Sequence, residues 1–372
     1  MRITVTQYAA DMTEQVAQFN ARLQRAGVSP LFPACHMPVW LPKAPGRQVF
    51  QEYFVATDDV GAVRGAYGLK HQDFWINGRT VSIADLQTPV SEGVVNRAYT
   101  RVGVKLLLDA LQRQPLLFGL GMGGYEMPIA RLLHAAQWEL CSVPFYFRVV
   151  HPLSFLHNID YLRRSAPMRV MANLVALSGL GWLGIKGWQL LWHRIRRQEN
   201  GIRIEIVDEF SSWADDLWQR CKPHYLMSAV RDCATLQILY PKDQQKFIRL
   251  KISQNGQAIG WAVLLNTALS GHKQFGNMQL GSIIDGFAAP ADAGKVIRAA
   301  QRVLEEQHAD LIVSNQAHAA WCRALADAGF SRGPSNFLFA SAPQLSELLR
   351  AAGAKSDDLH LNRGDGDGPI NL

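Results

Sequence analysis

Cysteine is scarce in this sequence of 372 residues, with five scattered copies and no Cys-x-x-Cys pair. This number and spacing argue against a disulfide scaffold and against a thiolate zinc site. Residues 1–19 alternate like a strand and then become polar, so they lack the apolar core of a signal peptide. Both absences fit a reducing compartment, and we expect a cytoplasmic protein.

Charged residues are also few, at 19% of the chain against 48% hydrophobic residues. Such a composition excludes a disordered, collagen-like or coiled-coil protein, and the length is typical of two domains. The net charge of +7 comes almost entirely from residues 160–203, which hold eight basic and two acidic side chains, a surplus of six. Because the positive charge is confined to one segment, we do not expect nucleic acid as a partner.

An apolar stretch, residues 171–192, lies inside this basic segment and carries three tryptophans beside several arginines. As a helix it would be roughly 33 Å long, enough to cross the apolar core of a bilayer. A lysine, a glutamine and four glycines count against a stable span. Tryptophans next to arginines are typical of a helix in the membrane interface, and we place a contact with an anionic membrane surface on residues 168–197. An interfacial helix, a buried linker helix and a spanning helix stay open.

The first zone, residues 1–152, alternates predicted strands and helices. Two strands meet at a turn at Asn77-Gly78, and a helix with a 3.6-residue apolar stripe follows, with Thr100 as its N-cap. After Pro115 an apolar strand runs into a glycine-rich loop, and a short helix and an aromatic strand close the zone. This order predicts a mixed α/β domain.

The third zone, residues 202–345, repeats the order of the first. Residues 131–138 align with residues 323–330 at a shift of 192, and the aromatic strands that follow align at the same shift. An internal repeat of this kind fixes the architecture. The sequence therefore predicts an α/β protein of two tandem domains, each a central mixed sheet flanked by helices. Residues 153–201 would join the domains, and residues 346–372 would form a flexible tail.

Several motifs resemble a known family. LIVSNQAHAAWCRALADAGF, residues 311–330, resembles the fifth strand and following helix of the GNAT acyltransferase fold. LQTPVSEGVVNRAYTRVGVKLLLDALQRQPLLFGLGMGG, residues 86–124, resembles the tandem GNAT-type acyltransferases linked to bacterial exopolysaccharide systems, as do RDCATLQILY and HLNRGDGDGP further on. The resemblance covers most of the chain. It implies a GNAT-like fold in each half and acyl transfer from a CoA thioester.

The resemblance also implies where CoA binds. Its diphosphate would lie at the start of the helix after the fourth strand, where free N–H groups and the helix dipole favour negative charge. The usual Arg/Gln-x-x-Gly-x-Gly/Ala motif is incomplete in the first half, and the second half has only Gly294, with Asp292 beside it. The first half is therefore favoured, although the second half, or neither, stays open. The residues expected to bind acyl-CoA are Thr100, Arg101, Val102, Gly103, Val104, Gly121, Gly123 and Gly124.

Catalysis needs a base that takes a proton from the acceptor amine or hydroxyl. Glu92 and Asp285 occupy equivalent places in the aligned halves and are the candidate bases, with a surface or N-cap carboxylate as the alternative for each. The tyrosine that usually serves GNAT enzymes as general acid is replaced by leucine in both halves. Tyr125 and Tyr99 are the candidate substitutes, and half-buried packing residues are the alternative for both.

The sequence therefore predicts an acyltransferase of the EC 2.3.1 class that uses acetyl-CoA or another acyl-CoA and no metal. The expected acceptor is an amine or hydroxyl of a sugar or lipid-linked sugar in surface polysaccharide synthesis, at the inner face of the cytoplasmic membrane. Two alternatives stay open. One is a Fem-like aminoacyl transferase that uses aminoacyl-tRNA, and the other is a catalytically degenerate GNAT pair that acts as a binding or scaffold protein.

Overall fold

The computed structural model describes residues 2–29, 31–33, 41–152, 155, 201–272 and 276–366. These residues form two compact units. Unit 1 holds the described residues within Met1–Val143, Leu226–Val230 and Ser335–Leu359, and unit 2 holds those within Pro144–Tyr225, Arg231–Pro334 and His360–Leu372. The apolar stretch 171–192 and the membrane contact predicted for it lie outside the described residues. Within the described part, no helix is long and apolar enough to cross a membrane.

Unit 1 is built on a mixed sheet with the strand order β1-β2-β3-β4-β5-β15-β6, and β9 pairs with β3. Its strands are β1 (Thr4–Gln7), β2 (Phe50–Thr57), β3 (Val63–Ile76), β4 (Arg79–Ser91), β5 (Leu117–Leu120), β6 (Glu139–Ser142), β9 (Met227–Ala229) and β15 (Leu338–Ser341). Its helices are α1 (Thr13–Arg25), α2 (Thr100–Arg113), α3 (Pro128–Ala135) and α11 (Pro343–Ala351), with 3₁₀ turns η1 (Ala10–Met12), η2 (Glu92–Val94), η3 (Arg97–Tyr99) and η7 (Ser356–Asp358). β16 (Leu359–His360) lies where the chain passes from unit 1, which ends at Leu359, back to unit 2.

Helix α2 covers one face of this sheet and buries apolar side chains against residues of β2, β3 and β4. The sequence predicts Val104, Leu107, Leu108 and Leu111 as the apolar stripe, but Val104 and Leu108 are exposed, at 46% and 61%, so half of that stripe is wrong. The buried face carries Val102 and Leu106, which approach Gly65 of β3 so closely that a Cβ there would lie 2.8 Å from each. Burying a leucine of this kind contributes roughly 1.5–3 kcal/mol. Thr100 is the first helical residue and Tyr99 stands at the N-cap; the Thr100 hydroxyl donates to the Arg97 carbonyl at 2.7 Å and does not cap the helix. The sequence placed the cap one residue too late.

Unit 2 is built on a seven-stranded sheet with the order β14-β7-β13-β12-β11-β10-β8. Its strands are β7 (Phe145–Val149), β8 (Ile202–Val207), β10 (Ile248–Gln254), β11 (Gln257–His272), β12 (Gly276–Ala288), β13 (Leu311–Asn315) and β14 (Ser331–Gly333). Its helices are α7 (Ser212–Cys221), α8 (Cys233–Leu239), α9 (Ala293–Glu306) and α10 (Ala319–Asp327), with turns η5 (Lys222–His224), η6 (Pro290–Asp292) and η8 (Arg363–Asp365).

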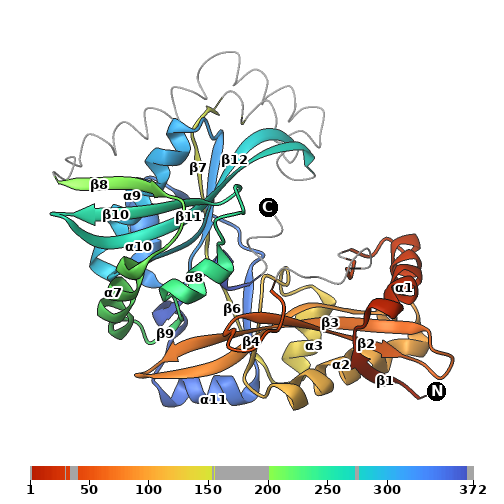
Figure 1. The fold of residues 1–372 in the computed structure, drawn as a ribbon. Coiled ribbons are helices and arrows are strands. Elements are labelled where there is room, and N and C mark those ends of the chain that lie inside the picture. Colours follow the sequence, from red (N-terminus) through yellow and green to blue (C-terminus); the bar gives the residue numbers. More distant parts are fainter. Residues whose placement is uncertain are drawn as a thin grey trace. The chain divides into compact units, whose positions relative to one another are not determined.

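The two sheets exchange their closing strands. β15, from the end of the chain, lies between β5 and β6 in unit 1 and pairs antiparallel with both. β7, from the first half of the sequence, pairs antiparallel with β13 in unit 2, where Figure 1 shows it near the label of β12. Each strand was predicted where it occurs, but its partner sheet was not. Neither sheet is therefore complete without a strand from the other half of the sequence.

The end of the chain is packed as far as Gly366. Residues 346–366 belong to the segment expected to be a flexible tail, yet they include most of α11 and the turn η8. Leu349, Leu359, Leu361 and Asp365 are buried, the last at 1% exposure. This part of the chain differs from the expected tail because its apolar side chains enter the cores, while Asn362 and Asp365 are held by hydrogen bonds.

Candidate functional site

In unit 1, β4 and β5 separate after a short parallel contact. The only registered pairs are Ala84 with Leu117 and Asp85 with Phe118. Beyond them, no registered pair joins the two strands, although each keeps its partner on its other edge, β15 for β5 and β3 for β4. Buried or half-buried strand edges need partners for their N–H and C=O groups. The edge of β4 beyond Asp85 is therefore suited to an extended ligand that carries amides.

A β-bulge in β4 lies directly beside this separation. The register of β3 and β4 shifts between Ala66 and Gly68, so that two residues of β4, Thr88 and Pro89, have no registered partner. Thr88 has a φ of 44°, in the left-handed region that a β-branched residue rarely adopts. Bulges and strained backbone of this kind concentrate next to active sites, where they redirect side chains.

A chain of buried polar side chains crosses the sheet next to the bulge. The Tyr53 hydroxyl donates to Gln51 at 2.8 Å, and the Gln51 amide donates to Gln87 at 2.5 Å. The Gln87 amide in turn donates to the Asp85 carboxylate at 3.1 Å. Gly68 leaves room between Tyr53 and Gln87, since a Cβ there would lie 3.2 Å from the tyrosine ring. The chain of hydrogen bonds therefore ends at Asp85, where β4 and β5 separate.

Two charged groups belong to this row. Lys70 is the registered partner of Asp85, and each residue is only 1% exposed. Gln72 follows on the same face, with its amide nitrogen 3.4 Å from the Val230 carbonyl. Its side-chain oxygen is buried and has no hydrogen-bond partner among the described residues. Polar side chains are seldom buried in a sheet unless they bind one another or a ligand. We call Gln51, Tyr53, Lys70, Gln72, Asp85 and Gln87 the polar row.

The first turn of α2 borders a basic groove of about 1060 Å³. Four cations line it, Arg2, Arg97, Arg101 and Lys105, against one carboxylate, Asp109. Asp109 already accepts from Arg113 at 2.7 Å and from the Tyr67 hydroxyl. No side chain caps the amino end of this helix within the described part of the chain. Of the residues expected to bind acyl-CoA, Thr100, Arg101, Val102 and Val104 line this groove.

Gly103 faces away from the groove, toward α3. A Cβ there would lie 3.7 Å from Leu132 and 3.8 Å from Ser91, so the position has room for one. Gly121 and Gly123 follow β5 and have φ angles of 85° and 88°, which favour glycine. Gly124 lies in the same loop, next to Glu126. The structure thus splits the expected acyl-CoA residues between the groove, the α3 side of α2 and the loop after β5.

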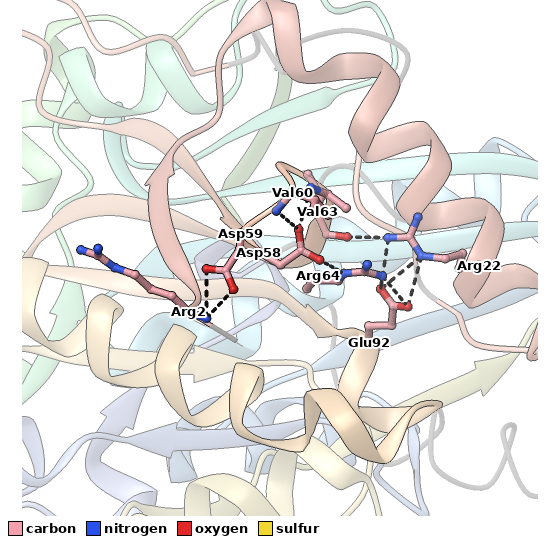
Figure 2. Close-up of polar contacts among 9 residues, drawn as sticks. Arg2, Arg22, Asp58, Asp59, Val60, Val63, Arg64 and Glu92 are labelled. Carbon is pink, nitrogen blue, oxygen red and sulfur yellow. Dashed lines mark hydrogen bonds and ion pairs between the residues drawn. The ribbon is translucent and has the colours of Figure 1, made fainter.

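Glu92 is buried in the turn η2 and is held by two arginines. Its carboxylate accepts from Arg22 of α1 at 3.1–3.2 Å and from Arg64 of β3 at 3.0 Å. Figure 2 shows Arg22 and Arg64 converging on this carboxylate, while Arg64 also reaches Asp58 at 2.7 Å. Burial acts to raise the pKa of Asp58, but Arg64 and the N–H groups of two loop residues outweigh it and hold that pKa below its ordinary value. The described contacts of Glu92 are those of an anchor.

The candidate tyrosines lie in different surroundings. Tyr99 stands at the N-cap of α2 with the Arg64 guanidinium 4.4 Å from its ring centre. Because Arg64 binds Glu92, the Glu92 network reaches the start of α2 through this stacked pair. Tyr125, in the loop after β5, is 55% exposed. Tyr125 is thus the more accessible of the two tyrosines.

Asp285 lies in β12 of unit 2 and is fully buried. It accepts from Arg231 at 3.0 Å, from the Tyr240 hydroxyl at 2.7 Å and from the Asn362 amide at 2.8 Å. Glu92, which the repeat aligns with it, lies in a turn after β4, so the two carboxylates belong to different elements. The roles of Glu92 and Asp285 as bases stay predictions.

The polar row was not predicted, although the sequence carries a signal for it. Lys70 and Gln72 are two residues apart in one strand, and Asp85 and Gln87 are two apart in the next. Residues two apart in a strand share a face. Each pair therefore puts two polar side chains on one face of a strand whose other residues are mainly apolar, which is unusual for a buried strand. Within the described ranges, no group of three or more His, Cys, Asp or Glu side chains could hold a metal ion.

Comparison with known proteins supports the fold at low sequence identity. No family model and no curated protein matches the sequence. The solved structure of Saccharomyces cerevisiae N-myristoyltransferase with bound myristoyl-CoA is similar at a TM-score of 0.54 and 11% identity, over 92% of this chain and 79% of its own. A GCN5-related N-acetyltransferase from Anabaena variabilis is similar at a TM-score of 0.53 and 11% identity, over 92% and 73%.

A third solved structure, a GCN5-related glucosamine N-acetyltransferase region of a fungal β-N-acetylglucosaminidase, is similar at a TM-score of 0.52 and 15% identity, over 91% of this chain and 38% of its own. Together with the two mixed sheets and their flanking helices, these likenesses confirm the predicted α/β fold and its GNAT-like character.

Proposed function

We propose that this chain is an acyltransferase of the EC 2.3.1 class that takes its acyl group from a CoA thioester and uses unit 1 as its catalytic unit. The observation that carries the proposal is the buried Asp85 at the point where β4 and β5 separate. A carboxylate there can reach an acceptor that approaches a thioester held along the open edge of β4. The fold neighbours support this class, since one of them contains myristoyl-CoA.

The residues of unit 1 divide the binding of acyl-CoA. The amides of the pantetheine arm would pair with the free edge of β4, and the diphosphate would bind at the start of α2. Arg97, Arg101 and Lys105 supply positive charge on the groove side of that helix. Charge-assisted hydrogen bonds from arginine to phosphate are the stronger kind, so Arg101 is the residue we expect to contribute most.

The chemical step is a direct transfer. The acceptor nitrogen or oxygen attacks the thioester carbonyl while Asp85 takes its proton, and the carbon–sulfur bond then breaks. The departing CoA sulfur takes up a proton to give free CoA and the acylated acceptor. Tyr125, exposed in the loop after β5, is the proposed source of that proton, with Tyr99 as the alternative. Proton transfer by a positioned base contributes about 10²–10⁴-fold in rate.

The acceptor that fits the polar row is rich in hydroxyl or amine groups. Gln51, Tyr53, Gln72 and Gln87 offer amide and hydroxyl groups on one buried face, and the Gln72 oxygen lacks a partner among the described residues. A sugar or lipid-linked sugar matches this chemistry, and a neighbour of the same fold is described as a glucosamine N-acetyltransferase. The resemblance to exopolysaccharide-linked acyltransferases supports a place in surface polysaccharide synthesis at the cytoplasmic face of a membrane.

Binding and transfer can be tested separately on the full chain. Acetyl-CoA or a longer acyl-CoA at 100 times its dissociation constant should stabilise the fold by about 2.7 kcal/mol, seen as a thermal shift. Arg101→Glu should remove this shift. Asp85→Asn should keep it and lower the release of free CoA thiol with amino-sugar acceptors by about 10²-fold or more.

Asp73→Asn is the matched control, because Asp73 lies in β3 on the opposite face of the same sheet. It should leave both readouts unchanged. No shift with any acyl-CoA would overturn the proposal, and tight binding of aminoacyl-tRNA in its place would favour the Fem-like alternative. Normal transfer by Asp85→Asn would remove Asp85 from the mechanism.

A further inference from the structure

The central parallel strands of unit 2 also separate. β12 and β13 pair from Leu280 with Leu311 to Ile283 with Ser314, and the pairing stops there. A bulge at Ile284 follows, where the register of β11 and β12 shifts. Beyond it, the end of β12 and the residues after β13 are no longer paired with each other. We call the space between residues 284–288 and residues 315–317 the unit 2 gap.

The end of the chain fills this gap. On the β13 side, Asn362 forms an antiparallel bridge with Gln316, and the Ala317 N–H donates to the Leu361 carbonyl at 3.0 Å. On the β12 side, the Asn362 amide donates to Asp285 at 2.8 Å. The segment therefore meets both sides of the gap, through its backbone on the β13 side and through the Asn362 side chain on the β12 side.

Aromatic packing and glycine fix the same segment. The fully buried His360 ring lies 5.7 Å from the ring of Phe287 in β12 and 5.4 Å from that of Trp321 in α10. Gly364 passes so close to Tyr240 that a Cβ there would lie 2.4 Å from the hydroxyl, and 3.0 Å from Asp285. The segment fits without spare room, so even a methyl group at position 364 would displace it.

A buried charge cluster holds the segment in place. Arg231 binds Asp285 of β12 at 3.0 Å and Asp365 of the segment at 2.8 Å, and all three side chains are 1% exposed. The Asp365 carboxylate also accepts from the Asn362 N–H at 2.9 Å, which closes the turn η8. Removing one member of such a cluster leaves a buried charge without its partner, which is strongly unfavourable. The cluster thus ties the segment to β12.

We propose that the unit 2 gap is a ligand cleft closed from within: residues 360–365 occupy it as an internal ligand, and acyl-CoA binds only in unit 1. The second clause rests on the proposed function, whereas the first does not. The start of α9 supports the second clause. It carries Asp292, which is paired with Lys295 at 2.8 Å, whereas the start of α2 in unit 1 carries Arg97 and Arg101. The chain is therefore expected to bind one equivalent of acyl-CoA, although it contains two GNAT-like sheets.

The test measures amide hydrogen exchange and acyl-CoA stoichiometry on the full chain. Without ligand, the amides of residues 361–365 should exchange slowly, like those of β12. With saturating acetyl-CoA, titration calorimetry should give one site per chain, and new protection should appear at the start of α2 and in β4. Exchange in residues 284–288, 315–317 and 361–365 should stay unchanged.

Gly364→Ala tests the fit of the segment. Its methyl group should displace the segment, so that residues 361–365 exchange about tenfold faster or more without ligand. Gly294→Ala in α9 is the matched control, because its methyl group meets only the flexible end of Arg298, at 3.2 Å. It should leave the exchange of residues 361–365 unchanged.

Three results would overturn the closed cleft: fast exchange of residues 361–365 in the unchanged protein, two acyl-CoA sites, or protection of residues 284–288 by acyl-CoA. Exchange in Gly364→Ala that matches the control would do the same. If acyl-CoA binds nowhere, the proposed function fails, and the closed cleft is then decided by the ligand-free exchange of the protein and its two variants.

Discussion

Lys70 and Asp85 stand directly opposite each other on β3 and β4, and each is 1% exposed. Opposed residues of an antiparallel pair have their Cβ atoms about 4.5–5.5 Å apart, so the two side chains start from neighbouring positions on one buried face. Removing one member of a buried pair costs about 3–5 kcal/mol. We expect Lys70→Met to lower the free energy of unfolding in urea by an amount of this order.

The double variant Lys70→Met/Asp85→Asn distinguishes pairing from packing. It should be more stable than the sum of the single variants predicts, with a coupling of about 0.5–3 kcal/mol. Lys43→Met is the matched control, because Lys43 pairs with Glu52 while its side chain is 62% exposed. It should change stability by less than about 1 kcal/mol. Additive effects in the double variant would show that Lys70 and Asp85 act independently.

Glu92→Gln should destabilise unit 1 by about 3 kcal/mol, because Arg22 and Arg64 would lose their shared carboxylate. It should also weaken acyl-CoA binding, since Arg64 stacks on the residue at the N-cap of α2. Glu139→Gln provides the comparison: Glu139 pairs with Arg350 at the surface, and its loss should cost less than about 1 kcal/mol. Urea unfolding and acyl-CoA titration measure the two effects. Equal stability of both variants would contradict an anchoring role for Glu92.

Thr88→Gly should stabilise the protein by about 1 kcal/mol or more, because glycine adopts the φ of 44° without the strain that threonine meets. Thr80→Gly, elsewhere in the same strand, should instead destabilise it by about 1 kcal/mol, since Thr80 does not have a positive φ. Thermal unfolding of the two variants should therefore shift in opposite directions. A destabilised Thr88→Gly would mean that packing of the threonine outweighs its backbone strain.

His360 should make stability depend on pH below neutrality. Burial lowers the pKa of His360 well below its ordinary value, and the positive charge of Arg231 and the nearby His318 add to this effect. The unfolded chain binds a proton at this residue near pH 6.5 while the folded chain does not, so stability falls as the pH drops below that value. Between about pH 7.5 and 5.5 this residue should cost roughly 1 kcal/mol.

The pH series is measured by urea unfolding of the wild type and two variants. His360→Gln should show a flatter dependence on pH than the wild type, whatever its absolute stability. His134→Gln, on the exposed side of α3, should keep the slope of the wild type. An unchanged slope in His360→Gln would assign the acid sensitivity to other groups.

Most elements could be predicted because their signals are local. The turn at Asn77-Gly78 has positive φ at both residues, as its sequence predicts, and the Asn255-Gly256 turn between β10 and β11 has the same geometry. The helix α2 and the apolar strand β5 also occur where expected, although the buried face of α2 is only in part the predicted one. Each of these features depends on a few neighbouring residues, so the sequence alone specifies it.

The exchange of β7 and β15 could not be predicted, since it depends on partners far away in the sequence. Phe145 and Phe147 in β7 resemble Phe337 and Phe339 near β15, so the two strands have the same pattern and either sheet could accept either one. Alternation specifies a strand and its faces but not its neighbour. The candidate site was missed in part for the same reason, because Asp85 and Lys70 meet only when β3 and β4 pair.

The exchanged strands also govern the order in which the chain can fold. β6 joins the sheet of unit 1 only through β15, which is synthesised almost 200 residues later. A ribosome-bound first half therefore lacks the strand that completes its sheet, and contacts so distant in sequence slow folding. A chain that ends before residue 338 therefore lacks the strand that joins β6 to the sheet of unit 1, even where every strand of the unit 2 sheet is already present.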